Sequence, residues 1–272
     1  MSGHLIAFYK AFGSAPTAQK LEVVVDGVLA AAGSASPTAL FVPAGMQVVA
    51  AFAISAGSAG TNGFSRARII SPTFLNVAYP DIRPLDGSGS TPADDPNVAN
   101  WLQRPLRYPD TDTIEIEVTD DSPTTPNLTA LVWLEVDREP VPPGETFWVR
   151  YTSSTAAVAN KWTALTIAMD QLPEGLYIVC GMEHVCTGCV GARLVFPGSP
   201  WRPGTLGQGS LANQTHRIFY DDSFGVWGRF PAYTPPTVEV LANAASTDHT
   251  GFLRVLRVGS ASRPGGMTRT GS

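Results

Sequence analysis

The sequence predicts an all-β fold of two tandem eight-stranded jelly-roll (β-sandwich) domains related by internal duplication. Short segments that are apolar or alternate between apolar and polar residues, each bounded by turn residues, are typical of strands. The 26 glycines and 23 prolines supply the frequent turns that such a fold requires. No amphipathic helix of three turns is evident. Finally, one block of sequence occurs twice, at a spacing close to half the chain.

The repeated block links residues 63–72 (GFSRARIISP) with residues 188–197 (GCVGARLVFP) at an offset of 125. The two copies share a glycine, an Ala-Arg pair and a proline, so that Arg68 falls on Arg193. Flanking segments repeat with offsets between 121 and 130. Chance matches would scatter in offset, so the pattern favours one β unit used twice, although any two sandwiches share some turn residues and alternation.

The first domain is predicted to span residues 1–138. Its clearest strands are 113–118 (TIEIEV), which alternates with period two, and 129–136 (TALVWLEV), which is apolar enough to be buried. The other strands expected in this half are, in order, 5–8, 20–26, 39–42, 47–54, 65–70 and 73–79. Residues 80–100, rich in proline and aspartate, are predicted to form a long loop, and loops of this length are usually functional or mobile.

The second domain is predicted to span residues 139–259, with a proline-rich linker at 138–144 (REPVPPG). A loop is expected at 183–188 and a second long loop at 197–216. Residues 260–272, rich in Gly, Ser and Arg, are expected to be a flexible C-terminal tail. The strands expected in this half are 146–151, 162–168, 176–180, 192–196, 217–220, 224–227, 237–241 and 251–258.

Composition excludes several function classes. The net charge is −5 without a basic cluster, unlike a protein that reads nucleic-acid sequence. Charged residues make up 15% of the chain, against ~25% in typical domains, which suits a surface covered by neighbours. The N-terminal residues lack the pattern of a signal peptide. Pro43 and Gly45 interrupt the apolar run at 39–56, which therefore does not predict a membrane span.

One cluster has the spacing of metal ligands. His184, Cys186 and Cys189 could supply three zinc ligands, with Glu183 as a fourth. No second Cys-x2-Cys is present, and packing explains the cysteines at least as well, because free cysteine is commonly buried. The expectation is therefore no cofactor and no metal, with His184, Cys186 and Cys189 as the candidate ligands if one binds.

No other constellation predicts catalysis. The sequence lacks a nucleophile elbow, a phosphate loop and a dinucleotide-binding fingerprint. The paired aspartates at 94–95, 120–121 and 221–222 fall at turns, where aspartate is a common turn former. We therefore expect a protein that is not an enzyme.

Two tandem jelly rolls, each with a long loop late in the barrel, resemble the double jelly-roll major capsid proteins of tailless icosahedral viruses, the lineage of adenovirus and several membrane-containing phages. The resemblance implies a structural virion protein that forms homotrimers of pseudo-hexagonal outline. Its partners would be neighbouring capsomers, other virion proteins or an internal membrane. It would be made in the host cytoplasm and reside in the virion.

In that family the long loops form outward towers and carry interactions. The resemblance therefore places the interaction candidates of this chain in its two long loops. These candidates are Asp81, Arg83, Asp86, Asp94, Asp95, Trp201 and Arg202.

Two other functions remain open at this stage. A phage decoration, fibre or filament-forming protein would share the β content and the lack of catalytic motifs. A carbohydrate-binding double β-sandwich would use exposed aromatic rings as a stacking platform. The candidate rings are Trp148, Trp201, Tyr220, Trp227 and Tyr233.

Overall fold

The chain folds almost entirely into β-strands in a computed structural model. The structure describes residues 3–13, 17–29, 31–32, 37–57, 65–72, 81–82, 84–88, 98–109, 112–120, 127–208 and 217–259. In this part of the chain the regular structure is strand, apart from short 3-10 turns such as η2 (Arg217–Phe219). None of the described segments forms a helix with the length and apolarity needed to cross a bilayer.

The first half forms two sheets. Sheet A has the order β10-β6-β13-β1-β3, and β9 and β11 also pair with β6. Its strands are β1 (Gly3–Ala11), β3 (Glu22–Val23), β6 (Gln47–Gly57), β9 (Pro84–Ser88), β10 (Ala99–Asn100), β11 (Leu106–Arg107) and β13 (Asn127–Glu135). Sheet B has the order β4-β5-β12-β7-β8, with β2 paired to β12. Its strands are β2 (Gln19–Lys20), β4 (Ala31–Ala32), β5 (Ala39–Phe41), β7 (Ser65–Ile70), β8 (Asp81–Ile82) and β12 (Thr113–Asp120).

The second half repeats this arrangement. Sheet C contains β16-β14-β22-β17 with β20 on β17, and sheet D contains β15-β21-β18. Strand β19 (Gly204–Gln208) pairs with both β18 and β17 and so joins the two sheets. The strands are β14 (Thr146–Ser153), β15 (Thr163–Leu165), β16 (Ala168–Met169), β17 (Leu176–Val185), β18 (Cys189–Val195), β20 (Gly228–Pro231), β21 (Thr237–Ala242) and β22 (His249–Gly259).

The two halves share one strand order. In the first, β1-β13-β6-β10 forms one sheet and β5-β12-β7-β8 the other. In the second, β14-β22-β17-β20 and β15-β21-β18-β19 correspond to them strand for strand. This is the order of a jelly roll, in which consecutive strands alternate between two packed sheets. The expected all-β, jelly-roll β-sandwich class is therefore confirmed.

The repeated block lies on β7 and β18, which hold the same place in the strand order, but the residues opposite it differ in register from the sequence alignment. Sequence matching equates Glu115 with Glu239. In the structure, Arg68 stands opposite Glu117 and Arg193 stands opposite Glu239. The partners therefore differ by two residues from the sequence alignment. A shift of two leaves each side chain on the same face of the sheet, which is why the alternation pattern does not reveal it.

Several expected segments differ from the structure. The strand expected at 20–26 is two short strands, β2 and β3, that pair in different sheets, and the strand expected at 162–168 is likewise β15 and β16. In each case the chain crosses between sheets, which period-two patterning cannot show. The expected loop at 183–188 begins later, because β17 runs to Val185.

The two long segments expected to be loops also contain strands. Strands β8, β9 and β10 lie within 80–100, and β19 lies within 197–216. Residues 217–220 begin as the 3-10 turn η2, and the strand expected at 224–227 starts instead at Gly228. The expected strand at 73–79 and the tail at 260–272 lie outside the described residues.

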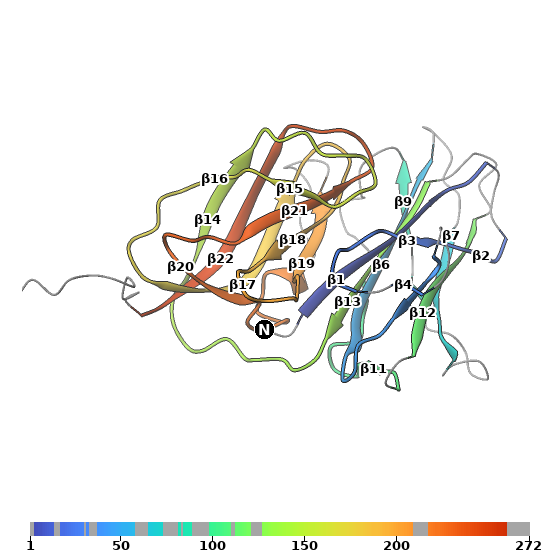
Figure 1. The fold of residues 1–272 in the computed structure, drawn as a ribbon, viewed down its shortest axis with the longest axis horizontal. Helices are drawn as coiled ribbons and strands as arrows, with labels where there is room; N and C mark the ends of the chain where they lie inside the picture. The colour runs from blue at the N-terminus through green and yellow to red at the C-terminus, as the bar shows by residue number, and fades with distance from the viewer. Residues whose placement is uncertain are drawn as a thin grey trace, which may run out of the picture.

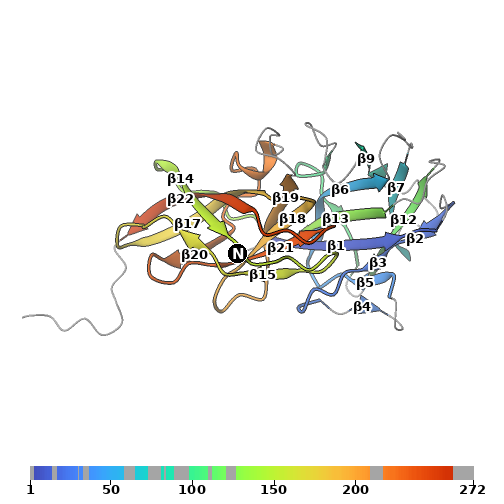
Figure 2. The same ribbon diagram turned by 90° about the horizontal axis from the view of Figure 1, so that it is seen from above.

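Sheet A is buried on both faces. Its inward side chains, such as Ile6 and Val132, meet sheet B in one hydrophobic cluster. Its outward side chains, among them Leu5, Leu131 and Trp133, belong to a second cluster that continues into the interior of the second half. This explains why β13 is buried at every position after Asn127. Figure 1 shows β1 and β13 beside β18 and β19, between the remaining sheets of the two halves, and Figure 2 shows the same neighbours from above.

Candidate functional site

The junction between the two halves depends on glycines that let strands approach closely. The backbone N–H of Leu5 in β1 donates to the carbonyl of Arg202, just before β19, at 2.9 Å. A Cβ on Gly191 would lie 2.9 Å from Leu131, and one on Gly204 would lie 2.8 Å from Leu5. Glycine is therefore required where sheet D contacts sheet A.

An aromatic cluster forms one part of the junction. Trp133 on β13 packs against Phe224 and Trp227 of the second half, with ring centroids 4.2 and 5.1 Å away. Both tryptophans are almost completely buried. Trp227 was a candidate for an exposed sugar-stacking ring, and its burial overturns that expectation. Aromatic pairs of this kind stabilise by about 0.5–1.5 kcal/mol beyond the area they bury.

A buried charged network forms the other part. Arg193 is fully buried on the face of β18 that meets the first half. Its Nε donates to Glu239 at 2.7 Å, and its Nη atoms donate to the carbonyls of Leu5 at 3.3 Å and Asp26 at 2.9 Å. The guanidinium also stacks over Trp162, with its carbon 4.1 Å from the ring centroid. A buried guanidinium is tolerated only when its donors are satisfied in this way.

His4 and Asp26 complete the network from the first half. His4 Nδ1 accepts from the backbone N–H of Arg202 at 3.1 Å, so the neutral ring carries its proton on Nε2, which lies 2.6 Å from Asp26 Oδ2. Burial lowers the pKa of His4. Burial acts to raise the pKa of Asp26, but the hydrogen bond from His4, the nearby charge of Arg193 and the backbone N–H of Val28 together lower it below its ordinary value. The pair is therefore neutral imidazole with carboxylate.

The expected interaction residues fall in two groups. Trp201 and Arg202 lie half-buried at the junction, where Trp201 meets His4 edge to face and Arg202 donates to the carbonyl of Asp26 at 2.8 Å. Both thus contact the other half of their own chain. In the other loop, Asp81 is in β8 and Asp86 in β9. Arg83, Asp94 and Asp95 lie outside the described residues.

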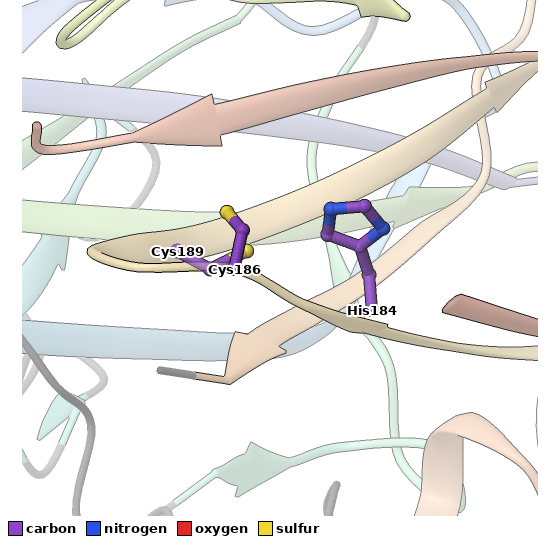
Figure 3. Close-up of side chains that lie close together, drawn as sticks. All are labelled: His184, Cys186 and Cys189. Carbon is purple, nitrogen blue, oxygen red and sulfur yellow. The ribbon is translucent and has the colours of Figure 1, made fainter. Parts of the chain in front are cut away.

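The expected metal-ligand candidates do converge. His184 near the end of β17, Cys186 in the following turn and Cys189 at the start of β18 place their ligand atoms within 4.8 Å of one another, all buried (Figure 3). The Cys189 N–H donates to the Cys186 carbonyl at 3.1 Å, which closes a tight turn. Gly188 occupies that turn with φ of +66°, a conformation that favours glycine.

A second histidine, not foreseen from the sequence, joins this cluster. His249 at the start of β22 lies with Nδ1 3.4 Å from His184 Nε2, and its side chain also hydrogen-bonds with Cys186. On the other side, the Tyr151 hydroxyl lies 2.7 Å from His184 Nδ1. His249 is 65 residues from His184, so only the pairing of β22 with β17 brings it here.

The electrostatics of the cluster favour one thiolate. The neighbouring Cys189 thiol lowers the pKa of Cys186, against the opposing effect of burial, and the nearby His184 and His249 lower it further. Burial, followed by the neighbouring Cys186, raises the pKa of Cys189. Burial lowers the pKa of His184. A thiolate beside a thiol and two imidazoles is a set of soft donors, which can bind a transition metal.

Comparison with known proteins gives a single structural match to report. No protein-family model matches the chain, and no curated protein matches it. Among solved structures, the chain is similar to the major capsid protein P2 from bacteriophage PM2, at 11% identity over 95% of this chain and 99% of that chain, with a TM-score of 0.22. The fold described above rests on the strand pairing of the chain itself.

The outer faces of sheets B and C lie at opposite ends of the described structure, and that of sheet C is partly covered by Val141, Tyr220 and Val226. On sheet B, Arg68 and Glu117 form an ion pair with Nε to Oε1 at 2.6 Å, and both are partly exposed. On sheet C, Trp148 is 43% exposed and packs edge to face with Tyr220. In Figure 1, β14 and β22 lie in the second half away from β1, and β7 and β12 lie in the first half away from β18.

Proposed function

We propose that the chain is the major subunit of a viral shell, a double jelly roll that assembles as a pseudo-hexagonal homotrimer. The observation that carries this proposal is that the contact between the two halves joins two different kinds of sheet face. The outer face of sheet D packs on the outer face of sheet A. The equivalent faces, sheet B of the first half and sheet C of the second, are left over at the two ends of the described structure.

The outer faces of sheets B and C are of the same two kinds as the faces that meet at the junction. Sheet B corresponds to sheet D, and sheet C corresponds to sheet A, by strand order. If the contact made within one chain is repeated between chains, sheet B of one copy meets sheet C of the next. Such a head-to-tail contact generates a closed ring when the rotation closes. Three chains would then contribute six similar barrels to one ring.

Side chains on the two faces support this pairing. Arg68 occupies on sheet B the position that Arg193 occupies on sheet D, where Arg193 makes its contacts across the junction. Trp148 and Arg150 lie exposed on β14, the strand equivalent to β1. Arg254 on β22 stands opposite Trp148. Exposed tryptophan and arginine are the residues most enriched at interface centres.

The composition also suits a shell subunit. A low share of charged residues, 15%, favours large contacts, because charged groups are depleted from interface cores. A stable contact of this kind buries about 1,200–2,000 Å² in total. The product of assembly would be a closed shell in the virion.

The proposal is tested by the mass and shape of the assembled protein. Native mass spectrometry of purified protein at micromolar concentration should give three chains per particle, and electron microscopy should show hexagonal outlines or closed shells. A stable monomer would refute the proposal. Fibres or open filaments would favour the alternative of a fibre or filament-forming protein.

A further inference from the structure

We propose that His184, Cys186, Cys189 and His249 form a tetrahedral zinc site in the second half of the chain. The ligand atoms of His184, Cys186 and Cys189 lie within 4.8 Å of one another, and His249 Nδ1 lies 3.4 Å from His184 Nε2. Each of the four residues comes from a strand end or turn that the fold holds in position. A two-cysteine, two-histidine set is a common ligand set of structural zinc. The site lies apart from the junction and from the outer faces of sheets B and C.

The spacing of the two imidazoles fits a shared metal. His184 Nε2 and His249 Nδ1 are 3.4 Å apart. Two nitrogen ligands at the usual zinc distance of about 2.0–2.1 Å, at a tetrahedral angle, lie about 3.3–3.4 Å apart. A direct N–H···N hydrogen bond is normally shorter, about 2.7–3.2 Å for comparable N–H donors. The separation is close to that of two nitrogen ligands of one ion.

The outer hydrogen bonds leave the correct nitrogen atoms free for the metal. His249 Nε2 lies 3.0 Å from the carbonyl of Thr155 and 3.2 Å from that of Ser246. Carbonyls only accept, so Nε2 carries the proton and the lone pair is on Nδ1, facing His184. Zinc-bound histidines usually donate their second N–H to a carbonyl or similar group in this way.

His184 has a matching outer partner. The Tyr151 hydroxyl, 2.7 Å from Nδ1, can accept a hydrogen bond from the Nδ1–H group, which leaves the lone pair on Nε2, the nitrogen that faces His249. Tyr151 is fully buried, as is His184. Its hydroxyl fixes the ring orientation, which is the role of the outer hydrogen-bond partner in a metal site.

The backbone also holds the two sulfur ligands in position. The Cys-Thr-Gly-Cys turn brings Cys186 and Cys189 to the same side, and the backbone N–H of Gln208 hydrogen-bonds to the Cys189 sulfur. Gly207 leaves room for that sulfur, since a Cβ there would lie only 2.2 Å from it. When zinc binds and Cys189 loses its proton, this amide hydrogen bond would stabilise the resulting thiolate ligand. Binding zinc would displace the remaining thiol proton to solvent.

Glu183, the fourth ligand considered from the sequence, is not needed. It neighbours His184 on β17, and side chains of successive strand residues point to opposite faces. The fourth donor is His249 instead. The donor set also narrows the choice of metal, because sulfur and imidazole favour zinc and other transition metals over hard cations such as calcium and magnesium.

Internal duplication provides a comparison within the same chain. At the offset of 125, the positions of His184, Cys186 and Cys189 correspond to Ala59, Thr61 and Phe64. At the offset of 121, His249 corresponds to Leu128. The first half thus lacks all four ligand types at the equivalent positions. A jelly roll of this kind does not need them for packing, so in the second half they serve an added purpose.

The metal would join the β17–β18 turn to the start of β22 at one end of the second half. The Asp248 carboxylate already accepts from the Thr187 hydroxyl at 2.8 Å across the same gap. Structural zinc contributes directly to folding stability, because the site does not exist in the unfolded chain. Zinc would therefore stabilise the end of the second half.

The experiment is a metal analysis of the full chain with matched variants. Protein purified under reducing conditions and supplied with zinc should hold about one zinc ion per chain. The variants Cys186→Ser and His249→Gln should each lose it. The control is Cys180→Ser, which removes another buried cysteine on β17 that contacts the Arg254 carbonyl and lies outside the cluster. It should keep the zinc.

A second measurement uses only the wild-type protein, so it does not depend on whether a variant folds. Metal-free wild-type protein titrated with Co²⁺ should develop the visible bands of tetrahedral cobalt and a thiolate-to-cobalt charge-transfer band. Bound zinc should also protect two of the three thiols from a thiol reagent. Absence of bound zinc and of the cobalt spectrum would refute the site. Zinc retained in both ligand variants, or a Cys186–Cys189 disulfide in the reduced preparation, would refute it equally.

Discussion

Arg193 pairs with Glu239 across two strands of the second half, yet its remaining donors bind the first half. Nε lies 2.7 Å from the Glu239 carboxylate, while Nη2 lies 2.9 Å from the carbonyl of Asp26. One side chain therefore links a strand pairing inside one half to the packing between halves. The same pairing at Arg68 and Glu117 faces outward on sheet B.

Arg193→Ala should strongly destabilise the chain. The change removes the closest partner of the Glu239 carboxylate and the donor to the buried carbonyl of Leu5, although Arg202 still lies 3.0 Å from Glu239. Removal of one partner of a buried ion pair costs about 3–5 kcal/mol, and the remaining Arg202 contact places the expected loss toward the lower end of that range. Denaturant unfolding of dilute protein measures this loss. Arg68→Ala is the matched control, because a partly exposed pair contributes about 0–1 kcal/mol. Equal losses for the two variants would contradict the different roles assigned to the repeated arginines.

Arg68→Ala should instead weaken assembly, as should Trp148→Ser on the opposite face. Both side chains lie on the sheet faces proposed to meet between chains. Each variant should fold with near wild-type stability and shift the distribution measured by native mass spectrometry toward monomers. The control is Val158→Ser, an exposed apolar side chain outside the strands. If assembly is unchanged in the first two variants, the proposed contact between sheets B and C is wrong.

Neither half should be stable alone. Cutting the chain within the 138–144 linker exposes the outer face of sheet A, including Leu131 and Trp133, which are buried against the second half. Exposed apolar surface of this size leads to aggregation. The isolated fragments should aggregate or unfold in circular dichroism, and co-expression should restore soluble protein. A soluble, cooperatively folded first half would show that the junction is dispensable.

Trp133→Ala tests the aromatic part of the same junction. Removal of a buried tryptophan in contact with Phe224 and Trp227 should cost about 3–5 kcal/mol in the free energy of unfolding. Thermal or denaturant unfolding measures the change. Trp148→Ala provides the comparison with an exposed tryptophan and should cost far less in dilute protein. A small effect of Trp133→Ala would mean that the halves are held chiefly by the charged network.

Stability should fall in acid, and His4 should account for part of the fall. Its pKa is lowered in the folded chain from the ordinary value of 6.5. Its neutral form is thus favoured by folding, and this contribution is complete above pH 6.5 and lost as pH drops toward the folded pKa. The lowered pKa of Asp26 acts in the same direction below its ordinary value of 3.8.

The measurement is the free energy of unfolding against pH for wild type and His4→Gln. Glutamine does not titrate, so the slope just below pH 6.5 should be shallower in the variant. The other histidines are unchanged between the two proteins, and their contributions cancel in the comparison. Identical slopes would show that His4 is not the group responsible.

The local sequence was sufficient to predict the strands that stay within one sheet. Ser65–Ile70 matches β7 from end to end, and the alternating segment at 113–118 lies within β12. Apolar alternation reports which face a strand buries, and this signal is local. The split of 20–26 between two sheets was not predictable in this way, because the crossing depends on which neighbours are available to pair.

The candidate metal site was likewise predicted from the sequence only in part. The sequence identified His184, Cys186 and Cys189 because they are close in the chain and have ligand spacing. It did not identify His249, which reaches the cluster only because β22 pairs with β17 across 65 residues. Nothing in the residues around His249 distinguishes it from any other histidine.

The sequence by itself determined the all-β class, and it predicted the use of one unit twice and the equivalence of Arg68 with Arg193. These follow from local alternation and from a nearly constant offset. Only the tertiary structure decided that Arg193 is buried between the halves while Arg68 faces outward, and that Trp133 packs on the second half. Two copies of one pattern carry the same local information. Their burial differs because the junction covers the outer face of sheet D, which carries Arg193. It does not cover the outer face of sheet B, which carries Arg68.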